Sequence, residues 1–145
     1  MSSRRLGTLV ACLWAGVLLC IALIATPAPF ATLASADAGR VVGRIFAQEA
    51  YLSLALSVVM FLIVRRQARL AAIARTGSVL STEVLLVLGA LFCTVAGYFA
   101  LQPMLEAARS GQGAFSFGTL HGVSVGFFGI KALLVLVLGW RLAGR

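Results

Sequence analysis

Four apolar blocks constrain the fold of this chain more than any other feature. They span residues 6–25, 42–64, 83–102 and 117–140. Each is close to the roughly 20 residues with which an α-helix crosses the hydrocarbon core of a bilayer. Lipid offers no hydrogen-bond partners to a peptide backbone, and none of the blocks alternates as a barrel strand would. We therefore expect an all-α integral membrane protein with four transmembrane helices.

The composition excludes a soluble domain. Apolar residues make up 61% of the 145 residues and charged residues only 11%, whereas soluble domains carry about 25% charged residues. The length suits one domain over 1–145. Pro27 and Pro29 are expected to end the first helix, and Pro103 the third. These prolines predict outer loops over 26–41 and 103–116, and a basic loop remains over 65–82.

The arginines predict the orientation of the four helices. Eight lie at the two chain ends or between the second and third blocks, and three lie in or beside the other two loops. Cytoplasmic loops of membrane proteins carry an excess of arginine and lysine. We therefore expect an antiparallel four-helix bundle with both termini and the loop 65–82 in the cytoplasm. The net charge of +8 is explained by these helix ends. Membrane lipids are therefore the expected partners, and nucleic acid is not.

Small residues recur four apart on the predicted helices, and this spacing lets helix backbones approach closely in lipid. The strongest run is Gly118, Gly122 and Gly126 in the last helix, and the third helix carries Gly89, Cys93 and Gly97. The run in the last helix serves packing within one chain or between two chains of a homo-oligomer. The three cysteines have no metal-binding spacing, so we expect no metal, no cofactor and no disulfide.

The last helix also contains the only histidine and the only lysine, His121 and Lys131. Counted from the outer ends of the apolar blocks, Glu49 and His121 lie at a similar depth, and Lys131 lies about 15 Å deeper than His121. Ionisable residues inside a membrane are candidates for function. We predict a polar site that opens outward, with Glu49 facing His121 and Lys131 at its base. The alternative is that these side chains only join helices by hydrogen bonds. The candidate set is Arg44, Glu49, His121, Ser124 and Lys131.

Three stretches resemble a known family. "GRIFAQEAYL" at 43–52, "VAGYFALQPMLEAAR" at 95–109 and "FGTLHGVS" at 117–124 look like a bacterial member of the domain of unknown function 4149 family, which is related to transmembrane protein 205 of animals. The resemblance runs from about residue 7 to 142. It implies a small four-helix membrane protein of the bacterial inner membrane, without an established activity and without catalytic residues to carry over.

Two functions lead at this level, with an enzyme or cofactor carrier as a third and weaker alternative. The first is a small transporter or channel component that uses the polar site, and the second is a non-transporting protein that binds a partner or organises lipid. An enzyme is not expected, because the chain lacks a Ser/His/Asp set, an HExxH motif and a phosphate-binding loop. A cavity lined by the polar residues favours transport. Tight packing around them, with an exposed glycine face on the last helix, favours the second function.

Overall fold

The computed structural model describes residues 3–144 and is helical throughout its regular elements. The elements are α1 (Ser3–Cys20), η1 (Ile21–Ala25), α2 (Pro27–Thr32), α3 (Ser35–Ile73), α4 (Thr82–Thr94), η2 (Val95–Ala100), α5 (Leu101–Arg109) and α6 (Phe117–Ala143). The η elements are single π-helical stretches inside otherwise α-helical rods. The prediction of an all-α chain is confirmed.

Four continuous helical rods are long and apolar enough to cross a membrane. They are Ser3–Thr32, Ser35–Ile73, Thr82–Arg109 and Phe117–Ala143. Each contains one of the four apolar blocks, so the prediction of four membrane-spanning helices agrees with the structure. The chain is a multi-pass membrane protein.

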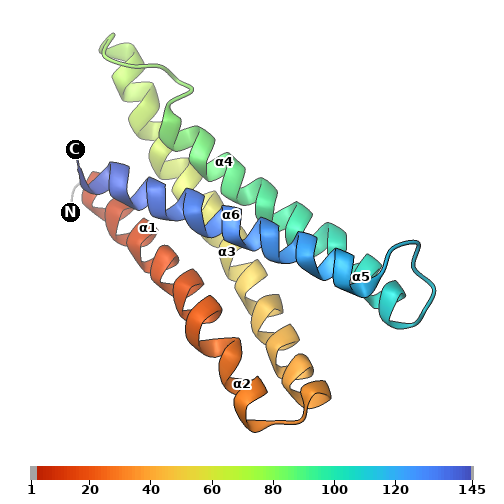
Figure 1. The fold of residues 1–145 in the computed structure, drawn as a ribbon. Helices are drawn as coiled ribbons and strands as arrows, with labels where there is room; N and C mark the ends of the chain where they lie inside the picture. The colour runs from red at the N-terminus through yellow and green to blue at the C-terminus, as the bar shows by residue number, and fades with distance from the viewer. Residues whose placement is uncertain (1–2, 145) are drawn as a thin grey trace.

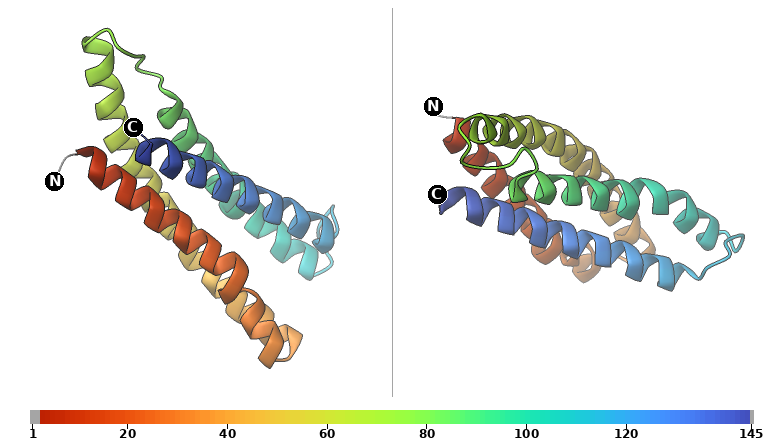
Figure 2. Two further views of the ribbon diagram at one scale, coloured as in Figure 1. Left: turned by 60° about the vertical axis from the view of Figure 1, so that its left-hand side comes forward. Right: turned by 90° about the horizontal axis from the view of Figure 1, so that it is seen from above.

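The four rods form two helical hairpins, shown in Figure 1. The first hairpin runs from α1 to α3 and the second from α4 to α6. Contacts between the hairpins join α1 to α6 and α3 to α4, so each long helix has two neighbours and one diagonal partner. Both termini lie towards one end of the molecule, and the hairpins diverge towards the other end (Figures 1 and 2).

The apolar core lies in the half of the molecule nearer the termini. It includes Trp14 and Leu18 of α1, Met60 of α3, Val87 of α4 and Leu138 of α6. All five side chains are fully buried. Because the hairpins separate beyond this core, the far half of each hairpin is held mainly by its own two helices (Figure 2).

The prediction that prolines end the first and third helices is wrong. A proline clashes with the carbonyl four residues earlier, which here belongs to Leu23 for Pro27 and to Phe99 for Pro103. Both carbonyls lie in a π-helical stretch, η1 or η2. A π-helical stretch shifts the hydrogen bonds to more distant partners, and the amide of Thr26 accordingly donates to the carbonyl of Ile21 at 2.9 Å. The helix therefore continues past each proline.

The predicted outer loops are consequently shorter than expected. Leu33 and Ala34 alone separate α2 from α3, in place of the loop 26–41. In the predicted loop 103–116, α5 occupies residues 103–109. At the other end, α3 continues through the basic segment to Ile73, so the predicted loop 65–82 is shorter than expected. The hydroxyl of Ser81 caps α4, and the hydroxyl of Ser116 caps α6 at Phe117.

Candidate functional site

A buried ion pair joins α3 to α6. The ammonium of Lys131 donates to both carboxylate oxygens of Glu49, at 2.7 Å to Oε1 and 2.9 Å to Oε2. Glu49 is 4% exposed and Lys131 3% exposed. Charge-assisted, two-pronged contacts of this kind are the stronger hydrogen bonds in proteins. The two ionisable groups thus satisfy each other inside the membrane-spanning helices.

The pair crosses the middle of the molecule. Among the described residues, α3 and α6 make no direct backbone contact, since each packs against α1 and α4 instead. The two helices are diagonal partners, and only long side chains can meet across that diagonal. Glu49 and Lys131 therefore tie the first hairpin to the second through the interior.

Two further side chains extend the polar cluster. The hydroxyl of Ser53, one turn after Glu49 on α3, donates to Glu49 Oε1. The indole Nε1 of Trp14 on α1 donates to that hydroxyl oxygen at 2.9 Å. The cluster Trp14–Ser53–Glu49–Lys131 thus links three helices. Ser57, one turn further on α3, is fully buried, and its hydroxyl has no partner in the described part of the chain.

An aromatic contact lies on the side of the pair nearer the diverging ends. Phe46 stands one turn before Glu49, and Phe128 one turn before Lys131. Their rings meet edge to face with centroids 5.3 Å apart. The ammonium of Lys131 also lies 5.0 Å from the centre of the Phe128 ring. The Phe46–Phe128 contact therefore adjoins the ion pair where the hairpins begin to separate.

The predicted pairing of Glu49 with His121 is wrong. His121 is exposed and stacks on Phe117, with ring centroids 5.7 Å apart. The apolar block begins at residue 42, whereas α3 begins at Ser35, so Glu49 lies deeper than the block indicates. From the true helix starts, Glu49 and Lys131 are each fourteen residues along their helix. They are therefore at matching depth.

The other two predicted site residues do not join the cluster. The hydroxyl of Ser124 donates to the backbone carbonyl of Gly97 at 2.9 Å and so joins α6 to η2. Arg44 is exposed on α3 and forms no ion pair with Glu49 or Glu106 in the described structure. Glu106 instead accepts a hydrogen bond from Gln102 at 3.3 Å. The predicted set of five is therefore reduced to Glu49 and Lys131.

The glycine runs differ sharply in their surroundings. A Cβ placed on Gly97 would lie 2.5 Å from the Cβ of Phe127, and one on Gly89 would lie 3.0 Å from Leu134. The third helix thus uses its small residues for packing within the chain, as predicted. On α6, a Cβ on Gly122 or Gly126 would meet no atom within 4 Å, and one on Gly118 would meet only the hydroxyl of Ser116. That glycine face is unoccupied within one chain.

No group of three metal-binding side chains occurs in residues 3–144. The cysteines are unpaired, with Cys12 and Cys20 exposed and Cys93 buried. The polar cluster contains one carboxylate, one ammonium, one hydroxyl and one indole. Its chemistry is that of an ion pair with hydrogen-bonded support.

Sequence comparison assigns the family. The family model described as Domain of unknown function (DUF4149) matches residues 9–113. The chain belongs to the DUF4149 family. The match covers α3 with Glu49 and ends before α6, so His121, Lys131 and the glycine run lie outside it. No curated protein and no solved structure matches the chain.

Proposed function

We propose that this DUF4149 protein is a non-catalytic, non-transporting membrane protein that acts by association through the glycine face of α6. The observation that carries this proposal is the empty space beside Gly118, Gly122 and Gly126. Meanwhile Glu49 and Lys131 are buried and paired. Tight packing of the polar residues combined with an exposed glycine face is the pattern that favours association over transport.

The position of the glycine face supports this proposal. Gly122 lies nine residues before Lys131, about 180° around the helix. The face therefore points away from the chain's own interior. In lipid, helices associate by close van der Waals contact between small residues, because apolar burial gives no driving force there. A second copy of the chain, presenting the same face of α6, is the simplest partner.

The proposed setting is a bacterial inner membrane, in which the rods form an antiparallel bundle with both termini inside. The excess of arginines at the two ends and between the second and third rods supports this orientation. The proximity of both termini to one end of the molecule is consistent with it (Figure 1). We also propose, from the sequence motifs, that the chain is related to transmembrane protein 205 of animals.

The experiment that tests the proposal measures self-association in vesicles. Donor- and acceptor-labelled chains are co-reconstituted, and Förster transfer is followed as lipid dilutes the protein. Gly126→Leu should abolish transfer, because a bulky side chain keeps the helices apart. Gly16→Leu on α1 is the matched control, since Gly16 is also exposed with no atom within 4 Å of its Cβ position. Wild-type transfer no higher than that of unrelated helices would overturn the proposal, as would equal loss in both variants.

A second candidate function is a transporter or channel component, and the position of the ion pair favours it. The Phe46–Phe128 contact stands next to the pair, on the side towards which the hairpins diverge (Figure 2). If those rings part, water reaches Glu49 and Lys131 from that side. Intramembrane ionisable groups commonly lie on such pathways. Water accessibility of the cluster decides between the two candidates.

A further inference from the structure

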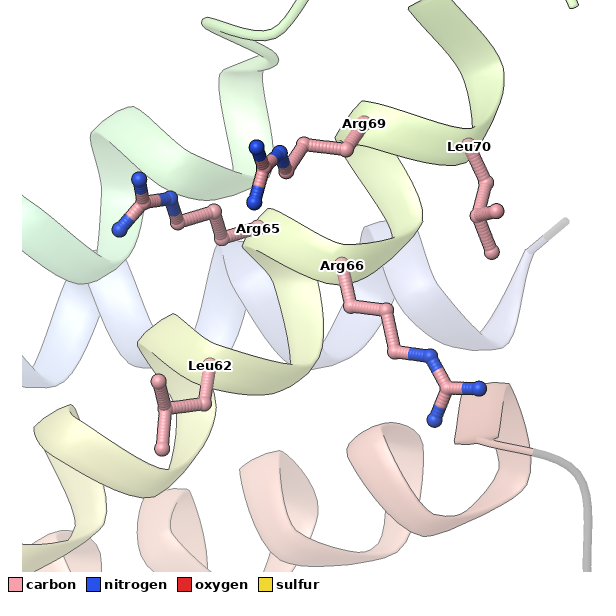
Figure 3. Close-up of a pocket in the computed structure, with 5 residues that line it drawn as sticks. All are labelled: Leu62, Arg65, Arg66, Arg69 and Leu70. Carbon is pink, nitrogen blue, oxygen red and sulfur yellow. The ribbon is translucent and has the colours of Figure 1, made fainter. Parts of the chain in front are cut away.

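A basic groove lies on the part of α3 nearer the termini. It is lined by Arg65, Arg66 and Arg69 and flanked by Leu62 and Leu70. Figure 3 shows that the side chains of Arg65 and Arg69 extend to one side of α3 and that of Arg66 to the other. All five side chains are exposed, the two leucines by 61% and 58%. The groove therefore combines three cations with apolar side chains on an open helix face.

The three arginines have no carboxylate partner in the described structure. The chain has four acidic residues, and each is engaged elsewhere. Asp37 pairs with Arg40, Glu49 with Lys131 and Glu83 with Arg141, while Glu106 accepts from Gln102. The guanidinium of Arg65 stacks over the ring of Phe61, 5.6 Å from its centre. The positive charge of the groove is thus left for a partner outside the chain.

The length of the groove along the axis of α3 matches the thickness of one headgroup layer. From residue 65 to 69 the helix rises about 6 Å, and each headgroup region of a bilayer is about 5–8 Å thick. Leu62 lies one turn before Arg66, towards the membrane-spanning part of α3. An anionic headgroup beside Arg65 and Arg69 would thus have Leu62 next to its acyl chains.

We propose that this groove binds the headgroup of an anionic phospholipid. Guanidinium groups bind phosphate oxygens in a planar, two-pronged geometry that a lysine ammonium does not reproduce. Basic residues beside a membrane attract anionic lipid, and each contributes about fivefold in affinity. The proposal is independent of the glycine face, since the groove lies on α3 and the glycine face on α6.

The test compares lipids at the protein surface. The full chain is reconstituted in phosphatidylcholine vesicles that contain trace spin-labelled phosphatidylglycerol or phosphatidylcholine. The motionally restricted fraction of each label gives the lipid selectivity. We expect several-fold selectivity for phosphatidylglycerol, reduced to near one in Arg65→Gln/Arg69→Gln and intermediate in Arg65→Lys/Arg69→Lys. Raising the salt concentration should weaken the selectivity of the unmodified chain, since salt screens exposed charges.

The matched control removes two other charges near the same end of the molecule. Arg4 and Arg75 are exposed and do not line the groove, so Arg4→Gln/Arg75→Gln should retain the selectivity. Equal losses in the two double variants would show general attraction to positive charge and overturn the groove as a site. The proposal would also be overturned if the unmodified chain showed no selectivity for phosphatidylglycerol, or if that selectivity did not change with salt concentration. The salt series needs no variant and is unaffected by misfolding.

Discussion

Glu49 and Lys131 depend on each other because both are ionisable groups inside membrane-spanning helices. A charged side chain near the centre of a bilayer costs about 2.5–3.5 kcal/mol on the insertion scale. In this protein the two charges meet at hydrogen-bonding distance and are buried together. Each therefore lowers the cost of burying the other, and the loss of one should harm the fold more than the loss of both.

Removing Lys131 alone should destabilise the protein severely. We expect Lys131→Met or Glu49→Met to lower the free energy of unfolding by about 3–5 kcal/mol, because each leaves a buried charge without a partner. The double variant should be more stable than either single variant. Unfolding in mixed micelles with increasing dodecyl sulfate, followed by circular dichroism, provides the measurement. Additive losses in the double variant would contradict an interaction between the two side chains.

The hydrogen bond from Trp14 to Ser53 should have a measurable but small energy. Interhelical hydrogen bonds in membranes average about 0.6 kcal/mol and reach about 1.7 kcal/mol. A double-mutant cycle of Trp14→Phe and Ser53→Ala should give a coupling energy in that range, measured by the same unfolding assay. Trp14→Phe with Thr94→Val is the control cycle, because Thr94 donates within its own helix to Ala90. Equal coupling in both cycles would argue against the hydrogen bond.

Part of the site could be predicted from single residues. Glu49 and Lys131 were correctly singled out as ionisable residues inside the helices, and both are buried. The pairing partner could not be predicted, because matching depth depends on where α3 begins, and hydropathy marks only its apolar part. Trp14 gave no signal, since an aromatic residue in an apolar helix has many ordinary uses.

At the scale of elements, the glycines of the third rod and of α6 should respond differently to the same change. Gly97→Ala should cost about 1–3 kcal/mol of stability, because its Cβ would collide with Phe127. Gly122→Ala should be neutral or stabilise by up to about 1 kcal/mol, since alanine is the better helix former. Thermal unfolding in detergent at low protein concentration distinguishes them. Equal effects would show that Gly97 is not closely packed.

Helix existence was easier to predict than helix length. Each apolar block correctly marks a helix, because burying a backbone in lipid requires internal hydrogen bonds. The ends were missed where the helix continues into polar sequence, as α3 does before residue 42. The helix ends predicted at the prolines were wrong for a different reason. A π-helical stretch accommodates each one, and hydropathy does not report it.

At the scale of the whole molecule, the proposed orientation has a direct test. Alkaline phosphatase, which is active only outside the cytoplasm, is fused after Ala34, after Gly77 or after Gln112. The charge asymmetry predicts activity at the first and third sites and none at the second. Green fluorescent protein at the same sites should give the opposite pattern. Activity only after Gly77 would require the inverted orientation and a new explanation of the arginines.

The two hairpins are joined tightly at one end and diverge at the other. The apolar core and the Trp14–Ser53–Glu49–Lys131 cluster hold them together, and the Phe46–Phe128 contact stands next to the cluster towards the divergence. Association through the glycine face leaves the contacts between the hairpins intact, whereas transport requires the hairpins to separate beside the cluster. Water access to the cluster is therefore the property of the whole molecule that distinguishes the two proposed functions.

We expect the cluster to be dry. In a background with Cys12, Cys20 and Cys93 replaced by Ala, a single cysteine at His121 should react with a membrane-impermeant thiol reagent. One at Ser57 should not, because Ser57 is fully buried and cysteine is close to serine in size. Adding Phe46→Ala to the Ser57→Cys chain tests the aromatic contact. Labelling that appears only then would show that the rings exclude water from a closed protein. Labelling of Ser57→Cys with Phe46 intact would mean that water already reaches the cluster, and the transport proposal would replace the association proposal.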